Sequence, residues 1–125
     1  MSRDTIIGIH KETTRLSTAE LVRQLNSHLG PTLVAALAAV KDRKLPHKWA
    51  QSDGPEPRPV SLERLHMAHR IWRLISSSDG DTVARAWFIG ANPRLDEESP
   101  IIAIRNGRGD DAHRAAVAFV EGGDE

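Results

Sequence analysis

The 125-residue sequence contains no cysteine. A disulfide framework, a thiolate metal site and a cysteine nucleophile are therefore excluded, and the composition is compatible with a reducing cytoplasm. No apolar run approaches the roughly 20 residues that a helix needs to cross a bilayer. The first residues also lack the long apolar segment of a secretory signal, so we expect a cytoplasmic protein with no membrane partner.

Common motifs of catalysis and ligand binding are absent as well. The sequence has no glycine-rich phosphate loop, no G-x-S-x-G and no H-E-x-x-H. His66 and His69 have a spacing that two metal ligands can use, but no second ligand pair accompanies them. Asp96, Glu97 and Glu98 form an acidic run without an opposed partner, which is typical of a solvated loop. We therefore expect no enzyme, no cofactor and no metal site.

Charge is balanced in number but not in position. The chain has 17 Lys and Arg against 17 Asp and Glu. Residues 1–75 carry twelve basic and seven acidic side chains, whereas residues 76–125 carry five basic and ten acidic ones. Because the two halves have net charges of opposite sign, we expect two different partners. The basic half favours nucleic acid, and the acidic half favours a basic protein surface or an anion-binding pocket. Chance clustering of solvated charges would give the same counts.

The apolar pattern predicts an all-α fold. Hydrophobic residues make up 39% and charged residues 27% of the chain, which is typical of a globular domain. Residues 1–16 show no convincing helical period, and we expect partial disorder there. The isoleucines at positions 6, 7 and 9 could form a short strand or simply pack against the rest of the protein. From residue 17 onward the apolar residues recur at helical spacing.

Seven helices are expected after residue 17. The first follows the capping box of residues 17–20 and ends at Gly30, and Pro31 begins the second. The third spans about two turns around Pro46, and the prolines and glycine of residues 52–59 predict a loop after it. The other helices are expected over residues 61–75, 81–89, 100–105 and from residue 110 or 111 to about 120.

A short basic helix after a tight turn is the pattern of a helix-turn-helix protein. Such a helix could present several basic side chains to the major groove and the flanking phosphates, while Trp49 anchors it to the core. A merely solvated basic helix has the same pattern. The predicted DNA contacts are Lys41, Arg43, Lys44, His47, Lys48 and Arg58.

Trp87, Phe88 and Ile89 are consecutive, so one helix cannot bury all three against a single neighbour. We expect part of this apolar surface to face a second partner, either a dimer mate or another protein. The alternative is that the last helix wraps round this one.

Residues 84–95 and 99–107 closely resemble the C-terminal toxin-binding domain of the Xre/MbcA/ParS antitoxins. The shared pattern is a tryptophan-bearing helix, an Asn-Pro-x-Leu loop, a Ser-Pro helix ended by glycine, and a helix of small residues, here 115–122. Lys48-Trp49 followed by Pro57-Arg58 resembles the Xre-like helix-turn-helix half of the same family. The resemblance covers about residues 17–122.

The resemblance implies two domains: an Xre-like helix-turn-helix bundle over residues 17–75 and a small toxin-binding and dimerisation domain over residues 79–122. Residues 1–16 would precede them, and residues 123–125 would form an acidic tail. It also implies a cognate RES-domain toxin that attacks NAD, operator DNA through which the protein represses its own operon, and self-association as a homodimer or within a larger toxin complex.

Antitoxins of this family place their C-terminal end at the toxin's active site. Acidic residues of the tail, with the terminal carboxylate, could then occupy the pocket for the NAD pyrophosphate as anions. The residues implied for toxin binding or dimerisation are Trp87, Phe88, Ile89, Asn92, Pro93, Leu95, Phe119, Glu121, Asp124 and Glu125.

Three alternatives remain open from the sequence. The protein could be a DNA-binding transcriptional regulator without a toxin, or an antitoxin whose helix-turn-helix no longer touches DNA. The basic third helix favours DNA contact, whereas Pro46 and the loop of residues 52–59 count against it. A small enzyme is a distant third, because no catalytic set converges.

Overall fold

The computed structural model describes residues 2–122, and within that range the chain is all-helical, as the apolar pattern predicts. The described part contains eight α-helices, one 3-10 turn and no strand. The helices are α1 Arg3–Arg15, α2 Thr18–Leu29, α3 Pro31–Ala38, α4 Leu45–Trp49, α5 Pro59–Asp79, α6 Asp81–Ile89, η1 Pro93–Leu95, α7 Pro100–Arg105 and α8 Gly109–Val120.

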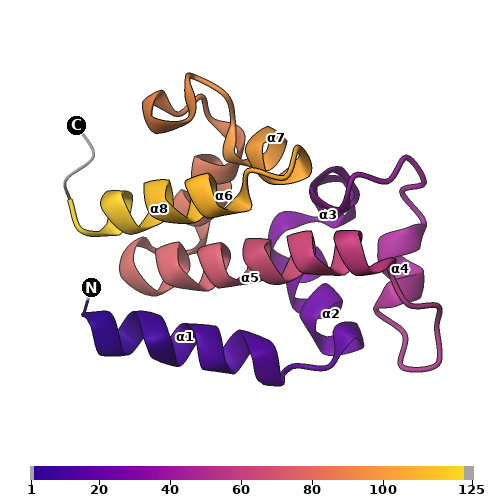
Figure 1. The fold of residues 1–125 in the computed structure, drawn as a ribbon. Coiled ribbons are helices and arrows are strands. Elements are labelled where there is room, and N and C mark those ends of the chain that lie inside the picture. The colour runs from indigo at the N-terminus through magenta and orange to yellow at the C-terminus, as the bar shows by residue number, and fades with distance from the viewer. Residues whose placement is uncertain (1, 123–125) are drawn as a thin grey trace.

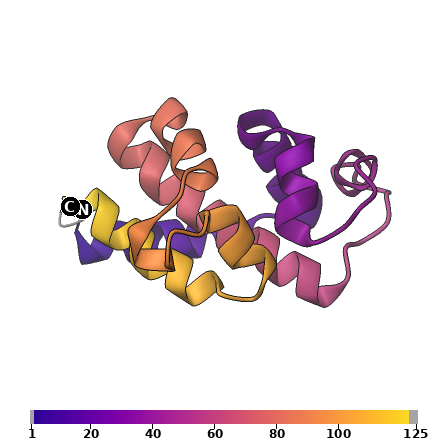
Figure 2. The same ribbon diagram turned by 90° about the horizontal axis from the view of Figure 1, so that it is seen from above.

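Helix α5 runs through the middle of the molecule (Figure 1), and α1, α3, α6 and α8 all pack against it. Its 21 residues bury side chains on more than one face, as Leu65 and Leu74 illustrate. A helix covered by several neighbours needs apolar residues around much of its circumference. Figures 1 and 2 together show that α1 begins and α8 ends at one end of the molecule, whereas α4 lies at the other.

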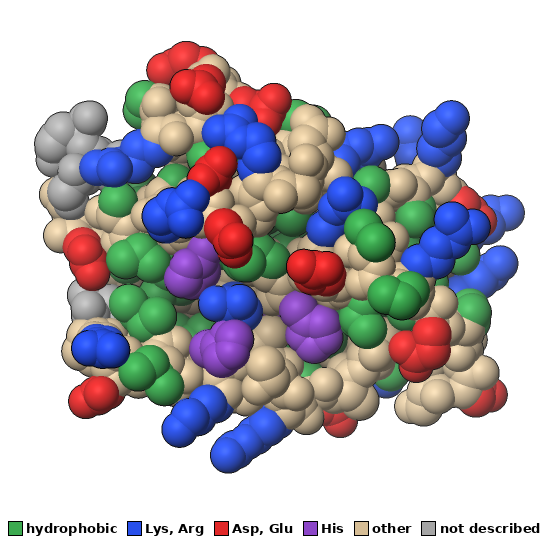
Figure 3. Space-filling model, viewed as in Figure 1, with side chains coloured by type: hydrophobic (Ala, Val, Ile, Leu, Met, Phe, Trp, Pro, Cys, Tyr) green, Lys and Arg blue, Asp and Glu red, His purple; other side chains and the backbone are tan. Residues whose placement is uncertain are grey.

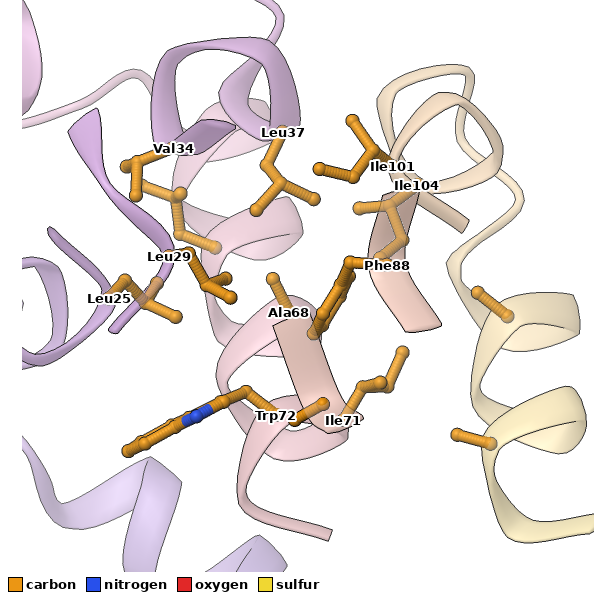
Figure 4. Packing of buried hydrophobic residues seen from close by; sticks show 14 of the residues in the cluster. Leu25, Leu29, Val34, Leu37, Ala68, Ile71, Trp72, Phe88, Ile101 and Ile104 are labelled. Atoms are coloured by element: carbon orange, nitrogen blue, oxygen red, sulfur yellow. The ribbon is translucent and has the colours of Figure 1, made fainter. Parts of the chain in front are cut away.

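The core joins the two halves of the sequence. Figure 4 shows side chains of α2, α3, α5, α6 and α7 meeting in one place. Leu29, Leu37, Ile71 and Phe88 are fully buried there. The buried hydrophobic residues from Ile9 to Ala116 form one cluster, so residues before and after the predicted domain boundary share a core.

Helix ends that depend on local chemistry lie where the sequence predicts them. Ser17 Oγ accepts a hydrogen bond from the backbone N–H of Glu20 at 3.2 Å, which is the capping interaction expected for α2. Ser99 Oγ caps α7 in the same way. Gly30 and Gly80 have φ of 87° and 92°, a left-handed region that glycine adopts without a Cβ penalty, and each separates two successive helices.

The expectation of a strand or partial disorder over residues 1–16 is wrong, because this segment forms α1. Ser2 Oγ accepts a hydrogen bond from Thr5 N and caps the helix. Ile9 and Thr13, four residues apart, are buried on the face that packs against α5. Tertiary packing thus stabilises a helix whose sequence has a weak apolar period.

The predicted N-cap of α5 near Ser61 is also wrong, because the N-cap is Arg58. The helix begins at Pro59, since proline is favoured in a first turn where its missing N–H costs nothing. The loop before it is therefore one residue shorter than the predicted 52–59. Ser61 is buried inside the helix, and its hydroxyl donates to the carbonyl oxygen of Ala38 in α3.

The same helix ends later than predicted. It continues through three serines to Asp79, because Gly80 is the first residue whose backbone leaves the helical region. The predicted boundary between residues 75 and 79 therefore lies within the last turn of α5. Helix α8 begins at Gly109, one residue before the earlier of its two predicted starts.

Candidate nucleic-acid interface and partner-binding surface

The predicted DNA-contacting residues lie in and around α4, at one end of the molecule. Figure 3 shows Lys and Arg side chains gathered at this end. Asp42 Oδ1 accepts a hydrogen bond from Lys44 N at 2.9 Å and so tightens the turn that precedes α4. Arg58, the residue before α5, lines the same groove as Lys41. The six side chains are all exposed: Lys41, Arg43, Lys44, His47, Lys48 and Arg58.

Helix α4 is shorter than the two turns expected from the sequence. It has five residues, of which only His47 and Lys48 belong to the predicted basic set. Pro46 is acceptable because it lies in the first turn. After the helix the chain folds back so closely that a Cβ at Gly54 would overlap the carbonyl oxygen of Lys48. The remaining basic residues therefore lie in the preceding turn or, for Arg58, after the loop.

Two side chains of α2 hold α4 in place. Asn26 Nδ2 donates to the carbonyl oxygen of Pro46 at 3.0 Å, and an Nη of Arg23 donates to that of Ala50 at 2.9 Å. Trp49 is 4% exposed and belongs to the core, which confirms its predicted role as the anchor of this helix. The exposed basic residues thus stand on a backbone fixed against the rest of the protein.

A groove that the sequence analysis did not predict lies beside α4. It has a volume of about 850 Å³ and runs between the end of α3, α4 and the segment leading into α5. Leu45, Trp49, Pro57 and Val60 contribute to its lining. The prolines that break the helix in this loop were the only hint in the sequence, and they predict a loop rather than a groove.

The three consecutive apolar residues of α6 are buried unequally. Phe88 is fully buried and Trp87 is 9% exposed, whereas Ile89 is 52% exposed. The ring of Trp87 packs against Phe119 of α8, with centroids 6.5 Å apart, so the last helix covers part of this surface. The buried Nε1 of Trp87 has no hydrogen-bond partner within residues 2–122.

The Asn-Pro-x-Leu segment forms a tight turn around η1. Asn92 is buried, and its Oδ1 accepts a hydrogen bond from Arg94 N at 2.9 Å. Leu95 is fully buried, whereas Pro93 is exposed. Asp96 and Glu97 follow with φ of 57° and 68°, values that non-glycine residues rarely adopt.

The acidic run after this turn is organised by one arginine. Arg108, at the start of α8, lies 3.6 Å from Asp96, 3.4 Å from Glu98 and 3.2 Å from Asp111. The cation gathers carboxylates from both sides of α7 and links the turn to α8. Asp96 and Glu98 therefore have a structural partner that the sequence analysis did not foresee, because Arg108 lies ten or more residues after them in the chain.

The rest of the predicted partner-binding set lies at the end of α8. Phe119 is half-buried and Glu121 is exposed, directly after the helix. Asp124 and Glu125, with the predicted acidic tail of residues 123–125, lie outside the described residues. The structure thus brings Trp87 and Phe119 into contact.

His69 is not available as a metal ligand. It is fully buried, and both ring nitrogens make hydrogen bonds of 2.8 Å, one with Thr13 Oγ1 and one with Gln24 Oε1. In the described part of the chain no three His, Asp or Glu side chains are arranged to hold a metal ion. None of the helices within residues 2–122 is both long and apolar enough to cross a bilayer.

The fold and these two surfaces define an all-α protein with a basic end around α4 and a partly apolar surface formed by α6, η1 and α8. No protein-family model, no curated protein and no solved structure matches the chain.

Proposed function

We propose that the protein is an antitoxin of the Xre/MbcA/ParS type that binds and neutralises a RES-domain toxin acting on NAD. The observation that carries the proposal is the order of α6, η1, α7 and α8, which follows the motif order of the family's toxin-binding domain. The buried Asn92 and Leu95 give a physical reason for the Asn-Pro-x-Leu pattern, because one caps the turn and the other fixes it to the core.

The surface around α6 has the chemistry of a protein interface. Ile89 is exposed, and the indole N–H of Trp87 is a buried donor without a partner among the described residues 2–122. An exposed apolar side chain beside an unsatisfied donor favours a partner that covers the first and offers an acceptor to the second. Phe119 and Glu121 lie at the end of α8, whose ring contact with Trp87 brings that end to the same surface.

Inhibition would come from the acidic C-terminal end. A toxin pocket that holds the pyrophosphate of NAD needs basic side chains or N–H donors. Glu121, with Asp124 and Glu125 beyond it, would enter that pocket as anions and exclude the cofactor. The protein itself would bind no cofactor in this mechanism.

Co-expression with the neighbouring reading frame tests the proposal. Expression of the neighbour alone should lower intracellular NAD, and co-expression with this protein should restore it. Deletion of residues 121–125 should release toxin activity while the complex still forms. The matched control replaces Glu121, Asp124 and Glu125 by their amides: if the amide variant inhibits as well as the wild type but the deletion does not, occlusion is steric. A neighbour that leaves NAD unchanged and forms no complex contradicts the proposal.

DNA binding is the second candidate function, as autorepression by the antitoxin or as the activity of a regulator without a toxin. The exposed basic side chains on a fixed backbone around α4 favour it, because phosphate contacts need positive charges held in place. A single module reads a short site, so a dimer would be needed for useful specificity.

The Lys48→Ala variant tests this second function. If Lys48 contacts a phosphate, the variant should bind a mixed-sequence duplex and the protein's own promoter more weakly by the same factor. The slope of log K against log salt should also fall by about one. Lys11→Ala, an equal charge change on α1, is the control and should leave the slope unchanged. An unchanged slope for Lys48→Ala removes this residue from the DNA contacts.

A further inference from the structure

A cluster of basic side chains lies where α1 and α8 flank α5, away from both surfaces described above. Figure 3 shows histidine side chains gathered around a Lys or Arg side chain on this face. His66 and Arg70 are four residues apart on α5 and so share one face of the helix. His113 of α8 interacts electrostatically with Arg70 and with His10 of α1. Helix α5 thus contributes two cationic or titratable side chains to the cluster, and α1 and α8 contribute one each.

Arg70 lacks the partners that other arginines of this protein have. Its Nε is buried and has no hydrogen-bond partner within residues 2–122, where the guanidinium also makes no ion pair. Arg73, one turn away, donates from Nε to Glu12 at 2.9 Å, and Arg108 pairs with three carboxylates. A buried guanidinium donor without an acceptor is uncommon, because such groups are nearly always satisfied in native structures.

The electrostatics of the cluster favour an anion. Burial lowers the pKa of His66, and the Arg70 charge lowers it further. Burial and Arg70 also lower the pKa of His113, with smaller contributions from His10 and Arg114, while Asp110 acts in the opposite direction. The groups facing the site from α1, α5 and α8 are therefore donors or potential cations, and Asp110 is the opposing charge that acts on both Arg70 and His113.

We propose that His10, His66, Arg70 and His113 form a binding site for a phosphate group between α1, α5 and α8. A phosphate offers several acceptor oxygens and a double negative charge, which match a planar guanidinium fork and imidazole N–H donors. Inorganic phosphate and a phosphate monoester have this chemistry in common. The site is independent of the antitoxin function, because none of its residues belongs to the basic end or to the surface around α6.

Binding at this site should take up protons. The Arg70 charge disfavours a second positive charge on His66 or His113, and the negative charge of a bound phosphate would favour it. The pKa of both histidines should therefore rise on binding. The affinity for the phosphate dianion should therefore increase as the pH falls from 8; near pH 6 a phosphate monoester takes up its own second proton and loses part of its charge, so affinities are compared per dianion. Asp110 competes with the anion for Arg70, so the Asp110→Asn variant should bind phosphate more tightly than the wild type.

Titration of the full chain with inorganic phosphate, followed by NMR of the imidazole groups, tests the proposal. Sodium chloride at equal ionic strength is the reference. Saturable shifts of His66 and His113 with phosphate but not with chloride are expected. Arg70→Gln should weaken phosphate binding about ten-fold or more, as loss of a charge-assisted pair of hydrogen bonds implies. Lys11→Gln, an equal charge change on an exposed residue beside His10, should leave the affinity unchanged.

Each outcome of these experiments either supports or overturns the phosphate site. Phenyl phosphate binding more tightly than inorganic phosphate assigns the site to a monoester, and the reverse assigns it to the free anion; both support a phosphate site. Equal shifts with chloride, or equal losses in Arg70→Gln and Lys11→Gln, overturn it in favour of general surface charge. If Arg70→Gln does not fold, unchanged phosphate affinity in Asp110→Asn overturns it as well.

Discussion

The buried His69 shows how one residue can join three helices. Gln24 Oε1 can only accept a hydrogen bond, so His69 Nε2 carries the proton and donates it. His69 Nδ1 is then unprotonated and accepts from the hydroxyl of Thr13. The neutral imidazole of His69 thus links α5 to both α1 and α2 through its two hydrogen bonds. A proton on Nδ1 would reverse the hydrogen bond with α1, because Thr13 Oγ1 would then accept, and it would place a positive charge in the buried site.

The stability of the protein should fall on acidification because of this histidine. Burial lowers the pKa of His69 from 6.5 to about 4, with a smaller opposing contribution from Glu12. Between these two values the unfolded chain binds a proton that the native protein does not bind. As the pH falls from 7 to 4, the free energy of unfolding should therefore decrease by about 3 kcal/mol from this residue.

Urea unfolding at several pH values measures this effect. The His69→Gln variant should be less stable than the wild type at pH 7, because it loses well-placed hydrogen bonds. It should nevertheless lose less free energy of unfolding between pH 7 and pH 4. His47→Gln, which changes an exposed histidine, should keep the wild-type dependence. Equal losses in wild type and His69→Gln would show that other groups account for the acid sensitivity.

At the scale of elements, Asp81 joins three helices, α2, α5 and α6. It lies in the first turn of α6, where a negative charge is favourable. Its Oδ1 accepts from Trp72 Nε1 at 2.7 Å, and its Oδ2 lies 3.0 Å from His28 Nδ1 in the last turn of α2. His28 also stacks on Trp72, with ring centroids 4.3 Å apart. Burial raises the pKa of Asp81, but these two hydrogen bonds, together with the charges of His28 and Arg85, outweigh it and lower the pKa.

Replacement of Asp81 by alanine should remove its contacts with Trp72 and His28 and so destabilise the protein. The indole N–H of Trp72 would lose its acceptor and α6 its N-terminal charge, so we expect a loss of about 1–2 kcal/mol in the free energy of unfolding. Thermal unfolding followed by circular dichroism measures it. Asp79→Ala, an exposed acidic residue two positions earlier, is the control and should cost less than half as much. Equal costs for the two variants would contradict a specific role of Asp81.

The elements that the sequence predicts well are those whose ends depend on neighbouring residues. The bounds of α6, with Gly80 before it and Gly90 after it, match the predicted 81–89, and the serine caps of α2 and α7 are confirmed. Helix α1 was missed because one of its two buried positions is Thr13, whose burial depends on a histidine 56 residues away. Its apolar face becomes visible only when Thr13 is counted with Ile6, Ile9 and Leu16.

The candidate surfaces were predictable in composition but not in shape. The basic residues around α4 are exposed as expected. Helix α4 is nevertheless short, and Gly54 packs closely against Lys48 in its last turn, a contact that no local pattern predicts. Ile89 is exposed and Phe88 buried, in keeping with the expectation that one helix cannot bury three consecutive apolar residues. The cluster around Arg70 needs three helices from distant parts of the chain, so the sequence gives no sign of it.

At the scale of the whole molecule, the packing of α5 determines whether the two halves of the protein unfold together or separately. It packs against α1 and α3 from the basic half of the sequence and against α6 and α8 from the acidic half. Trp49 and Trp87 come from opposite sides of the predicted domain boundary, and both belong to the single buried cluster. Because neither half could keep its share of this core without α5, we expect both halves to unfold in one cooperative transition.

Two variants that each keep one tryptophan test this cooperativity. One retains Trp49 and the other retains Trp87, with the remaining tryptophans replaced by phenylalanine; both lose the hydrogen bond of Trp72 equally. In each variant, the fluorescence of the retained tryptophan and the circular dichroism signal should report the same urea midpoint, because both probes follow one core. A fluorescence transition that precedes the loss of helix in either variant would instead show that residues 17–75 and 79–122 unfold independently, as two domains with a dispensable contact between them.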